Sequence, residues 1–569
     1  MSDLQENNKQ PETVSTKDQN ELVEILVTTN EGVDFHIIHD ELCRDTANDD
    51  SVDSNIVPDR VCECVAEYPN NDRVTSYKLS RAEAKKLKND PRILSVDDPS
   101  EDKIELNAVQ DGDFNRNYSS NNGQQENWGL LCHTNKDNNI YQANESDPGG
   151  TYDYVLDGTG VDVVIIDSGI EPDHPEFQDA NGVSRVKEVN WSTVSGVSFT
   201  QSANHYRDHD GHGTHVAGTV AGKTFGWAKN ADIYAMKLAG LEGQNDSGTG
   251  ISITNCFNAL KDWHNKKNNP SDPAYTGRPT VVNMSFGFTT SVTQIDNTMY
   301  INGFAVTGGS YRGTGHSVSN MIDLWEQYGF QGRFFSRGLA VNSTYDTLVG
   351  QLADAGIHIC IAAGNNAYKI DVFGGNDYDN NLTTAINTYP YHKGATPRLG
   401  TNGDKPGFMV GWLNNADYST GIYAKSQSSC CGPQVNMYCS GQAIMSAMPR
   451  NSDAQTGSNS SAQNSGDYFG DSTYKQKKIQ GTSMASPQMA GMVACLLQAH
   501  PDWSPAQAQK WFESNASTNI YTSGSSDDWE HQVSGADWSL NAGILRTLWG
   551  STPRVAYFAM KGDKPFNIG

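Results

Sequence analysis

The sequence has no apolar run long enough to cross a membrane. A transmembrane helix needs about 20 consecutive apolar residues, and no stretch of this 569-residue chain approaches that length. The first 20 residues also lack the basic start and the apolar centre of a secretory signal. These absences argue against a membrane partner, and they predict that the chain stays in the cytoplasm or joins a larger particle such as a virion.

Basic residues are scarce as well. Lysine and arginine together number 41, against 67 aspartates and glutamates, which gives a formal net charge of −26. A surface that binds nucleic acid needs clustered basic side chains, because these displace counterions from the phosphates. The charge balance therefore removes nucleic acid from the expected partners.

Cysteine is too scattered for a disulfide-based fold. The ten cysteines are spread through the whole chain, whereas disulfide scaffolds concentrate them in short secreted domains. Cys360 and Cys495 lie in apolar runs and are predicted to be core residues. Cys430 and Cys431, with Cys439 close by, leave a bridge or a metal site open, although no histidine partner or CxxC spacing accompanies them.

Composition divides the chain into five regions. The polar start has no apolar periodicity, which predicts disorder. A compact α+β pattern follows, and an Asn-, Ser- and Gly-rich tract after it has the composition of a linker. The predicted regions are residues 1–20 (disordered), 21–107 (small α+β domain), 108–127 (linker), 128–550 (large domain) and 551–569 (tail).

The small domain carries signals for strands and for a helix. ELVEILVTT, VCECVAEY and RILSV are predicted to be strands. The stretch SRAEAKKLKNDP is predicted to be a helix that begins at Ser80 and ends before Pro91.

In the large domain, apolar strands alternate with helical stretches. The candidate strands VDVVIID, ADIYAMKL, TVVNMSF, IHICIAA and GFMVGW are apolar throughout. Strands of this kind are typical of a parallel sheet that is covered on both faces, so the predicted fold class is a three-layer α/β sandwich with a mainly parallel sheet. Two stretches interrupt the pattern, an insertion at about 288–340 and a polar loop at 451–470.

Three polar residues stand at the ends of these elements and form a candidate catalytic triad. Asp167 closes the strand VDVVIID, His212 opens a stretch of small residues, and Ser483 opens a predicted helix. A serine hydroxyl becomes a nucleophile when a histidine takes its proton, and a buried carboxylate holds that histidine in the required tautomer. We therefore interpret Ser483 as nucleophile, His212 as general base and Asp167 as the residue that orients it.

Two further features accompany the nucleophile. Asn365 follows the apolar run CIAA, and its side-chain amide is a candidate oxyanion donor together with the backbone N–H of Ser483. Pro487 is expected in the first turn of the helix that Ser483 opens, where its missing N–H costs least.

The motifs resemble a known family in the family's own order. DSGI, HGTHVAG, NMSFG, AAGNN and GTSMASP are similar to successive blocks of subtilisin-like serine peptidases, nearer the proteinase K branch, over roughly Trp128 to Pro505. The resemblance implies a serine endopeptidase that acts on polypeptide substrates without a required cofactor, with structural calcium as an expectation from the family. The substrate-binding residues it implies are Ser285, Phe286 and Gly287 in one cleft wall, Ser247 and Gly248 in the opposite wall, and Ala362, Ala363 and Gly364 in the primary pocket.

The small domain resembles the inhibitory propeptide of the same enzymes. SYKLSRAEAKKLKNDPRILSVDDPSEDKIELN is similar to the end of such a propeptide, and NWGLLC is similar to the start of mature catalytic domains. The resemblance implies a self-processing zymogen in which the propeptide is an intramolecular inhibitor. The cut is expected between about Glu105 and Asn127.

Other interpretations of the same residues remain open. His205, His209, His212 and His215, with Asp208 and Asp210, are candidate metal ligands, although no HExxH pattern is present. The Asp- and Asn-rich stretches NNADY and GGNDYDN offer oxygen ligands for calcium, without EF-hand spacing. The alternative function is that of a catalytically silent structural or binding protein with the same fold, for example a component of a viral particle.

Overall fold

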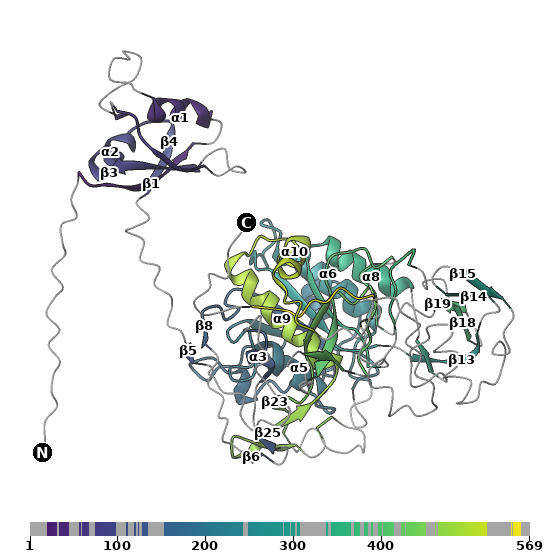
Figure 1. Ribbon diagram of the computed structural model, residues 1–569. Helices are drawn as coiled ribbons and strands as arrows, with labels where there is room; N and C mark the ends of the chain where they lie inside the picture. The colour runs from purple at the N-terminus through teal and green to yellow at the C-terminus, as the bar shows by residue number, and fades with distance from the viewer. Residues whose placement is uncertain are drawn as a thin grey trace, which may run out of the picture. The chain divides into compact units, whose positions relative to one another are not determined.

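The computed structural model contains two compact units, Met1–Ala108 and Val109–Gly569, and each is described here by itself (Figure 1). The structure describes residues 20–30, 33–44, 56–58, 60–67, 74–97, 128–134, 153–242, 248–287, 343–365, 369–375, 396–400, 402–414, 423–426, 428–450, 461–462, 465–520, 548 and 550–558. It also describes the backbone of short strands at 110–111, 119–120, 123–124, 289–295, 298–301, 304–307, 337–339, 381–384 and 388–390.

The first unit is a four-stranded antiparallel sheet with two helices. Its strands lie in the order β2-β3-β1-β4, and the chain alternates as βαββαβ, a recurrent supersecondary arrangement. One hydrophobic cluster, which includes Val27, Tyr77 and Leu79, forms its core. The elements are β1 (Leu22–Thr29), α1 (Phe35–Cys43), β2 (Cys64–Glu67), β3 (Val74–Ser80), α2 (Arg81–Leu87) and β4 (Ile93–Asp97).

The predicted elements of this unit are present, but two others were not predicted. Ser80 caps α2 by accepting from the backbone N–H of Glu83, whose side chain in turn accepts from the backbone N–H of Ser80. This reciprocal cap explains why the helix begins where the sequence predicts. Helix α1 was missed although Ile38 and Leu42 are spaced by four and both lie in the core. Strand β3 was missed as well, and pairing with β1 over its full length stabilises it.

The second unit is built on an eight-stranded sheet. Seven strands follow the order β10-β11-β9-β12-β17-β20-β21, and β22 also pairs with β20. All of these pairings are parallel except that of β20 with β21, which confirms the predicted mainly parallel sheet. The strands are β9 (Asp162–Asp167), β10 (Val186–Lys187), β11 (Asp232–Lys237), β12 (Thr280–Met284), β17 (His358–Ala362), β20 (Phe408–Asn414), β21 (Ala424–Lys425) and β22 (Met437–Ser440).

Helices cover both faces of this sheet and make three layers (Figure 1). Successive side chains of a strand point to opposite faces, and β9 shows the consequence. Val163 and Ile165 pack in the cluster that contains the buried residues of α5 and α9, whereas Val164 and Ile166 pack in the cluster of α6 and α8. The four helices are α5 (His212–Ala221), α6 (Ile253–Lys267), α8 (Ser343–Asp354) and α9 (Thr482–Ala499).

Smaller elements surround this sandwich. A separate three-stranded sheet has the order β23-β25-β24, and a four-stranded sheet of order β16-β13-β18-β19 joins the 288–340 insertion to residues 381–390. The remaining elements are β5 (Gln110–Asp111), β6 (Ser119–Ser120), β7 (Gly123–Gln124), α3 (Trp128–Leu131), β8 (Asp153–Tyr154), η1 (Pro175–Phe177), α4 (Trp191–Ser195), β13 (Thr289–Ile295), β14 (Thr298–Ile301), β15 (Phe304–Thr307), β16 (Arg337–Leu339), β18 (Asn381–Thr384), β19 (Thr388–Pro390), β23 (Ile444–Met448), β24 (Gly466–Tyr468), β25 (Asp471–Ile479) and α10 (Pro505–Asn515).

The segment expected to be a polar loop at 451–470 contains strand β24 near its end. Tyr468 is buried beside Phe225, and its hydroxyl donates to Glu176 at 2.8 Å. Strand β24 could not be predicted from the polar composition of this segment, because contacts with residues far away in the sequence stabilise it. Residues 451–460 lie outside the described part of the chain.

All ten cysteines lie in the described part of the chain, and all ten are free thiols. Cys430, Cys431 and Cys439 are buried and form no bridge, and Cys360 and Cys495 are core residues as predicted. Within the described residues, no helix combines the length and apolarity that a membrane span requires.

Buried histidines give the fold an expected sensitivity to acid. Burial disfavours the imidazolium ion and lowers the pKa of five histidine rings. The pKa falls to about 3 for His215 and to about 4 for His133, His174, His264 and His358. The rings hydrogen-bond to backbone carbonyl groups, as His264 does with the carbonyl oxygen of Ala355. All five residues are buried.

We expect the free energy of unfolding to fall as the pH drops from about 6.5 to about 4. In this window the unfolded histidines bind protons and the folded ones do not, so each contributes a slope of up to about 1.4 kcal/mol per pH unit. Urea denaturation at pH 7, 6 and 5 measures this change in the free energy of unfolding, and the Ser483→Ala chain is used because it lacks the candidate nucleophile. Replacing His264 with glutamine should reduce the slope by about one proton, and a flat profile between pH 7 and 5 would contradict the prediction.

Candidate active site

The fold brings the predicted triad residues to neighbouring element ends. Asp167 is the last residue of β9, His212 is the first residue of α5, and Ser483 is the second residue of α9. Helices α5 and α9 pack against each other on the same face of the sheet. Because parallel strands end at a common edge, this is the edge at which α/β folds bind ligands.

Asp167 and His212 are directly hydrogen-bonded. The distance between Nδ1 of His212 and Oδ1 of Asp167 is 2.8 Å. A carboxylate can only accept, so Nδ1 carries the proton and the Nε2 atom of a neutral His212 keeps a free lone pair. The same Oδ1 accepts from the backbone N–H of Ser168 at 2.8 Å, while Oδ2 is buried and has no hydrogen-bond partner among the residues that the structure describes.

The electrostatic environment favours the protonated form of His212. Burial disfavours the imidazolium, but the adjacent Asp167 carboxylate outweighs it and raises the pKa of His212 to about 9. Asp208 and Asp210 act in the same direction. The side chain of His212 is still 24% exposed, whereas that of Asp167 is 1% exposed, so the base faces solvent and the carboxylate does not.

A glycine allows α5 to approach the end of β9. A Cβ atom at Gly213 would lie 2.1 Å from the carbonyl oxygen of Gly169 and 3.2 Å from the Cβ of Asp167. Any larger side chain would therefore push the helix, and His212 with it, away from the carboxylate. This contact gives a physical reason for the glycine after His212 in the HGTHVAG block.

The hydroxyl of Ser483 does not point to His212 in this structure. It donates to the backbone carbonyl of Ser285 at 3.1 Å, and the hydroxyl of Ser285 donates to the carbonyl of Ser483 at 3.1 Å. The expectation for Pro487 needs correction, since α9 begins at Thr482 and the proline lies in the second turn. Its missing N–H would have bonded to the carbonyl of Ser483, and the Ser285 hydroxyl replaces that donor.

The side chain of Asn365 is held by the residue before the nucleophile. Its Oδ1 accepts from the backbone N–H of Thr482 at 2.8 Å and from the Thr482 hydroxyl at 2.8 Å. A backbone N–H can only donate, so this end of the amide is the oxygen, and the Nδ2 donor points the other way. The N–H of Gly364 donates to the Thr482 hydroxyl at 3.1 Å, which ties the two loops together.

The predicted cleft residues differ in how deeply they are buried. Ser285 and Phe286 follow β12 and are largely buried, while Gly287 and Gly248 are exposed. Ser247 lies outside the described residues. The pocket residues follow in chain order, with Ala362 ending β17, Ala363 fully buried and Gly364 at the turn that leads to Asn365.

The family model described as "Subtilase family", Peptidase_S8, matches residues 158–535, which is more than half of the chain. This chain belongs to the subtilase family. The matched range contains all four candidate catalytic residues and both main helices of the site.

Curated relatives of this subtilase are peptidases. It is 26% identical over 502 residues to the alkaline serine exoprotease A of Vibrio alginolyticus, which covers 84% of this chain and 65% of that protein. It is 40% identical over 104 residues to a cuticle-degrading serine protease of Arthrobotrys oligospora, which covers 18% of this chain and 23% of that protein. The chain thus spans less than two thirds of either relative.

The solved structure of a cold-adapted subtilisin-like serine proteinase is also similar to this chain. The identity is 22% and the TM-score 0.40, with 77% of this chain and 98% of that chain covered.

The histidines of the subtilase motif are not gathered around a metal position. His205 contacts backbone groups of Thr249 and Lys237, and the Nε2 of His215 bonds to backbone carbonyls of β23 and β25. Among the described residues, no group of three or more His, Cys, Asp or Glu side chains is arranged to hold a metal ion. The two Asp- and Asn-rich stretches considered for calcium lie almost wholly outside the described residues.

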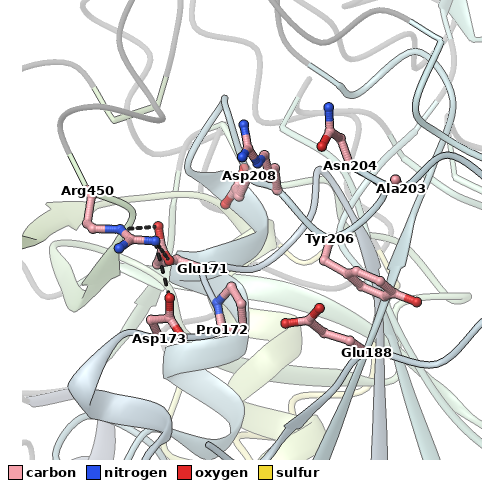
Figure 2. A pocket seen from close by; sticks show the side chains of 10 residues that line it. Glu171, Pro172, Asp173, Glu188, Ala203, Asn204, Tyr206, Asp208 and Arg450 are labelled. Atoms are coloured by element: carbon pink, nitrogen blue, oxygen red, sulfur yellow. Dashed lines mark hydrogen bonds and ion pairs between the residues drawn. The ribbon is translucent and has the colours of Figure 1, made fainter.

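Sequence reasoning considered Asp208 only as a candidate metal ligand and missed it as a second buried carboxylate behind the triad. Asp208 is 1% exposed and lies on the wall of a cavity of about 410 Å³ (Figure 2). Across this cavity, Arg450 forms ion pairs with Glu171 and Asp173, as the dashed lines in Figure 2 show. The only sequence signal for Asp208 was its place four residues before His212.

Proposed function

We propose that this subtilase is a serine endopeptidase that hydrolyses peptide bonds with Ser483 as nucleophile, His212 as general base and Asp167 as its orienting carboxylate. The observation that carries the proposal is the His212–Asp167 hydrogen bond of 2.8 Å, which leaves Nε2 as the basic atom. Membership in the subtilase family supports the same chemistry.

The backbone around Ser483 supports an oxyanion site. Among the first four N–H groups of α9, those of Thr482, Met484 and Ala485 have acceptors, whereas the N–H of Ser483 has none within the described residues. We propose that this N–H and the Nδ2 of Asn365, whose side chain is held by the residue before Ser483, are the two donors to the oxyanion. Donors of this kind stabilise the negative charge that develops on a peptide carbonyl.

The proposed reaction begins with a rotation of the Ser483 hydroxyl from the Ser285 carbonyl toward Nε2 of His212. His212 takes the hydroxyl proton as Oγ attacks the peptide carbonyl carbon, and Asn365 stabilises the oxyanion. The imidazolium then gives its proton to the leaving amine, which leaves an acyl-enzyme. Water repeats the sequence, and the acid product leaves with Ser483 restored.

We further propose an extended polypeptide as substrate and a zymogen as the initial product of synthesis. Ser285 to Gly287 on one side and Ser247 with Gly248 on the other would pair with the substrate backbone as edge strands do. Ala362, Ala363 and Gly364 would line the primary pocket. Residues 21–107, whose described part has its own sheet and core, would be the inhibitory propeptide.

A covalent probe tests this proposal directly. A fluorophosphonate is expected to label the wild-type chain at Ser483 and to leave the Ser483→Ala chain unlabelled, because only an activated serine attacks it. Intact mass and amino-terminal sequencing of the same samples should show a new start between about Glu105 and Asn127 in the wild type alone.

An exposed serine provides the control. Ser271 lies in a surface loop, so Ser271→Ala should be labelled and processed like the wild type. Labelling without a new amino terminus would refute self-processing while leaving the peptidase chemistry in place. A wild-type chain that is neither labelled nor cut would refute the enzyme and favour a catalytically silent structural protein.

A further inference from the structure

The helix that begins at His212 has no polar side chain at its N-cap. Gly211 occupies that position with a left-handed backbone, φ 94°, and provides no side-chain acceptor. The first N–H groups of a helix have no partners within the helix, so side chains from elsewhere must accept them. The three acceptors are Asp210 for the N–H of His212 (3.2 Å), Ser168 for that of Gly213 (2.8 Å) and Asp208 for that of Thr214 (2.8 Å).

Asp208 is the most heavily hydrogen-bonded of these acceptors. Its Oδ1 accepts from the hydroxyl of Ser168 at 2.9 Å and from the N–H of Gly211 at 2.8 Å. Its Oδ2 accepts from the N–H of Thr214 at 2.8 Å and from the Thr214 hydroxyl at 2.6 Å. The carboxylate is 1% exposed, so water does not substitute for these donors.

The surroundings specify the direction of each of these hydrogen bonds. The Ser168 hydroxyl accepts from the N–H of Gly213, and the Thr214 hydroxyl accepts from the N–H of Glu171 at 3.0 Å. An ionised carboxylate can only accept, so each hydroxyl donates its proton to Asp208. Four donors converge on one buried carboxylate and favour its ionised form, although burial outweighs them and raises the pKa of Asp208 above its usual range.

Ser168 connects Asp208 to the proposed catalytic pair. It is the residue after Asp167, and its backbone N–H donates to Oδ1 of Asp167, the atom that also binds His212. We propose that Asp208 is a positioning residue of the proposed peptide hydrolysis: it caps the helix that carries His212 and, through the Ser168 hydroxyl, ties that helix to the strand end that carries Asp167. The inference rests on the proposed function and adds a second carboxylate to its machinery.

The charges that face His212 distinguish positioning from a purely structural role. Asp167 is at the end of β9, Asp208 and Asp210 are in the loop before α5, and His215 is one turn along α5. Loss of the Asp208 charge should therefore make His212 easier to deprotonate. A contribution to folding alone would lower the melting temperature without changing that titration.

The test compares Asp208→Asn with Ser168→Ala. Asp208→Asn keeps one oxygen, which can accept either from Ser168 and Gly211 or from the two donors of Thr214, but not from both pairs. We therefore expect kcat to fall by roughly 10- to 100-fold with little change in KM. The midpoint of the pH profile of kcat/KM should also move below the wild-type value. Ser168→Ala keeps the Asp208 charge and breaks the link, so its kcat should fall while its midpoint stays.

A control variant and a direct titration of His212 distinguish a positioning role of Asp208 from a purely structural one. Asp179→Asn removes one carboxylate at a partly exposed position and should match the wild type. Titration of the His212 ring by proton NMR in the Ser483→Ala background needs no proteolysis, so it tests Asp208 even if the wild type hydrolyses nothing. An unmoved His212 midpoint in Asp208→Asn would overturn the proposal, and so would an unchanged kcat in Ser168→Ala.

Discussion

Replacing Asp167 with asparagine is expected to lower kcat by about 10⁴-fold, which is the largest decrease in kcat that we predict for any single substitution. The Asp167 carboxylate accepts the Nδ1 proton of His212 at 2.8 Å and thereby leaves Nε2 unprotonated. An asparagine amide can donate to Nδ1 instead, which would move the ring proton to Nε2. The ring would then have no lone pair available to take the proton of Ser483.

The same substitution should change the dependence on pH. Hydrolysis requires neutral His212, so kcat/KM of the wild type should rise with pH through about 9, the pKa to which Asp167 raises the ring. Without the carboxylate, the residual activity should reach its plateau at a lower pH. Steady-state rates on a peptide substrate from pH 6 to 10 measure both effects.

Asp179→Asn is the matched control for Asp167→Asn, since it makes the same chemical change at a partly exposed position in a surface turn. It should reproduce the wild-type rate and midpoint. If Asp167→Asn retained a kcat within tenfold of the wild type, or kept the same midpoint, then His212 would not depend on Asp167 and the proposed triad would be wrong.

Replacing Asn365 with leucine is expected to lower kcat by about 10²- to 10³-fold, equivalent to about 3–4 kcal/mol of transition-state stabilisation. Thr482 holds the amide oxygen with two hydrogen bonds of 2.8 Å, so the Nδ2 donor is oriented before any substrate arrives. A donor oriented in advance acts on the oxyanion more than on the ground-state carbonyl. We therefore expect KM to change little.

A second substitution distinguishes the loss of the Nδ2 donor from the loss of the hydrogen bonds that Oδ1 of Asn365 makes with Thr482. Asn365→Asp keeps an oxygen for the two Thr482 donors but removes Nδ2, so it should lose at least as much kcat as leucine while retaining more stability. Asn258→Leu, at a partly exposed position of α6, is the control and should keep the wild-type kcat. A normal kcat in both Asn365 variants would place the oxyanion donor elsewhere.

Much of the fold could be predicted from local patterns. The six residues of β9 are all buried, which is why an unbroken apolar run predicted a parallel strand with helices on both faces. Ser80 and Pro91 correctly bracketed α2, because a helix cap acts within one turn of the chain. Strands β3 and β24 were missed, because contacts with distant residues stabilise them more than their own periodicity.

The candidate catalytic residues were recognisable from short motifs, because a reactive side chain at an element end needs particular small neighbours. The sequence by itself determined that Asp167, His212, Asn365 and Ser483 are present in the order of the subtilase blocks. Only the tertiary structure decided which groups support them. Asp208 gains one of its four donors from Ser168, 40 residues away. The N–H that Pro487 lacks is replaced at the carbonyl of Ser483 by the hydroxyl of Ser285, which lies 198 residues before Ser483 in the chain. Hydrogen bonds across such separations depend on how the layers pack, and no local pattern encodes them.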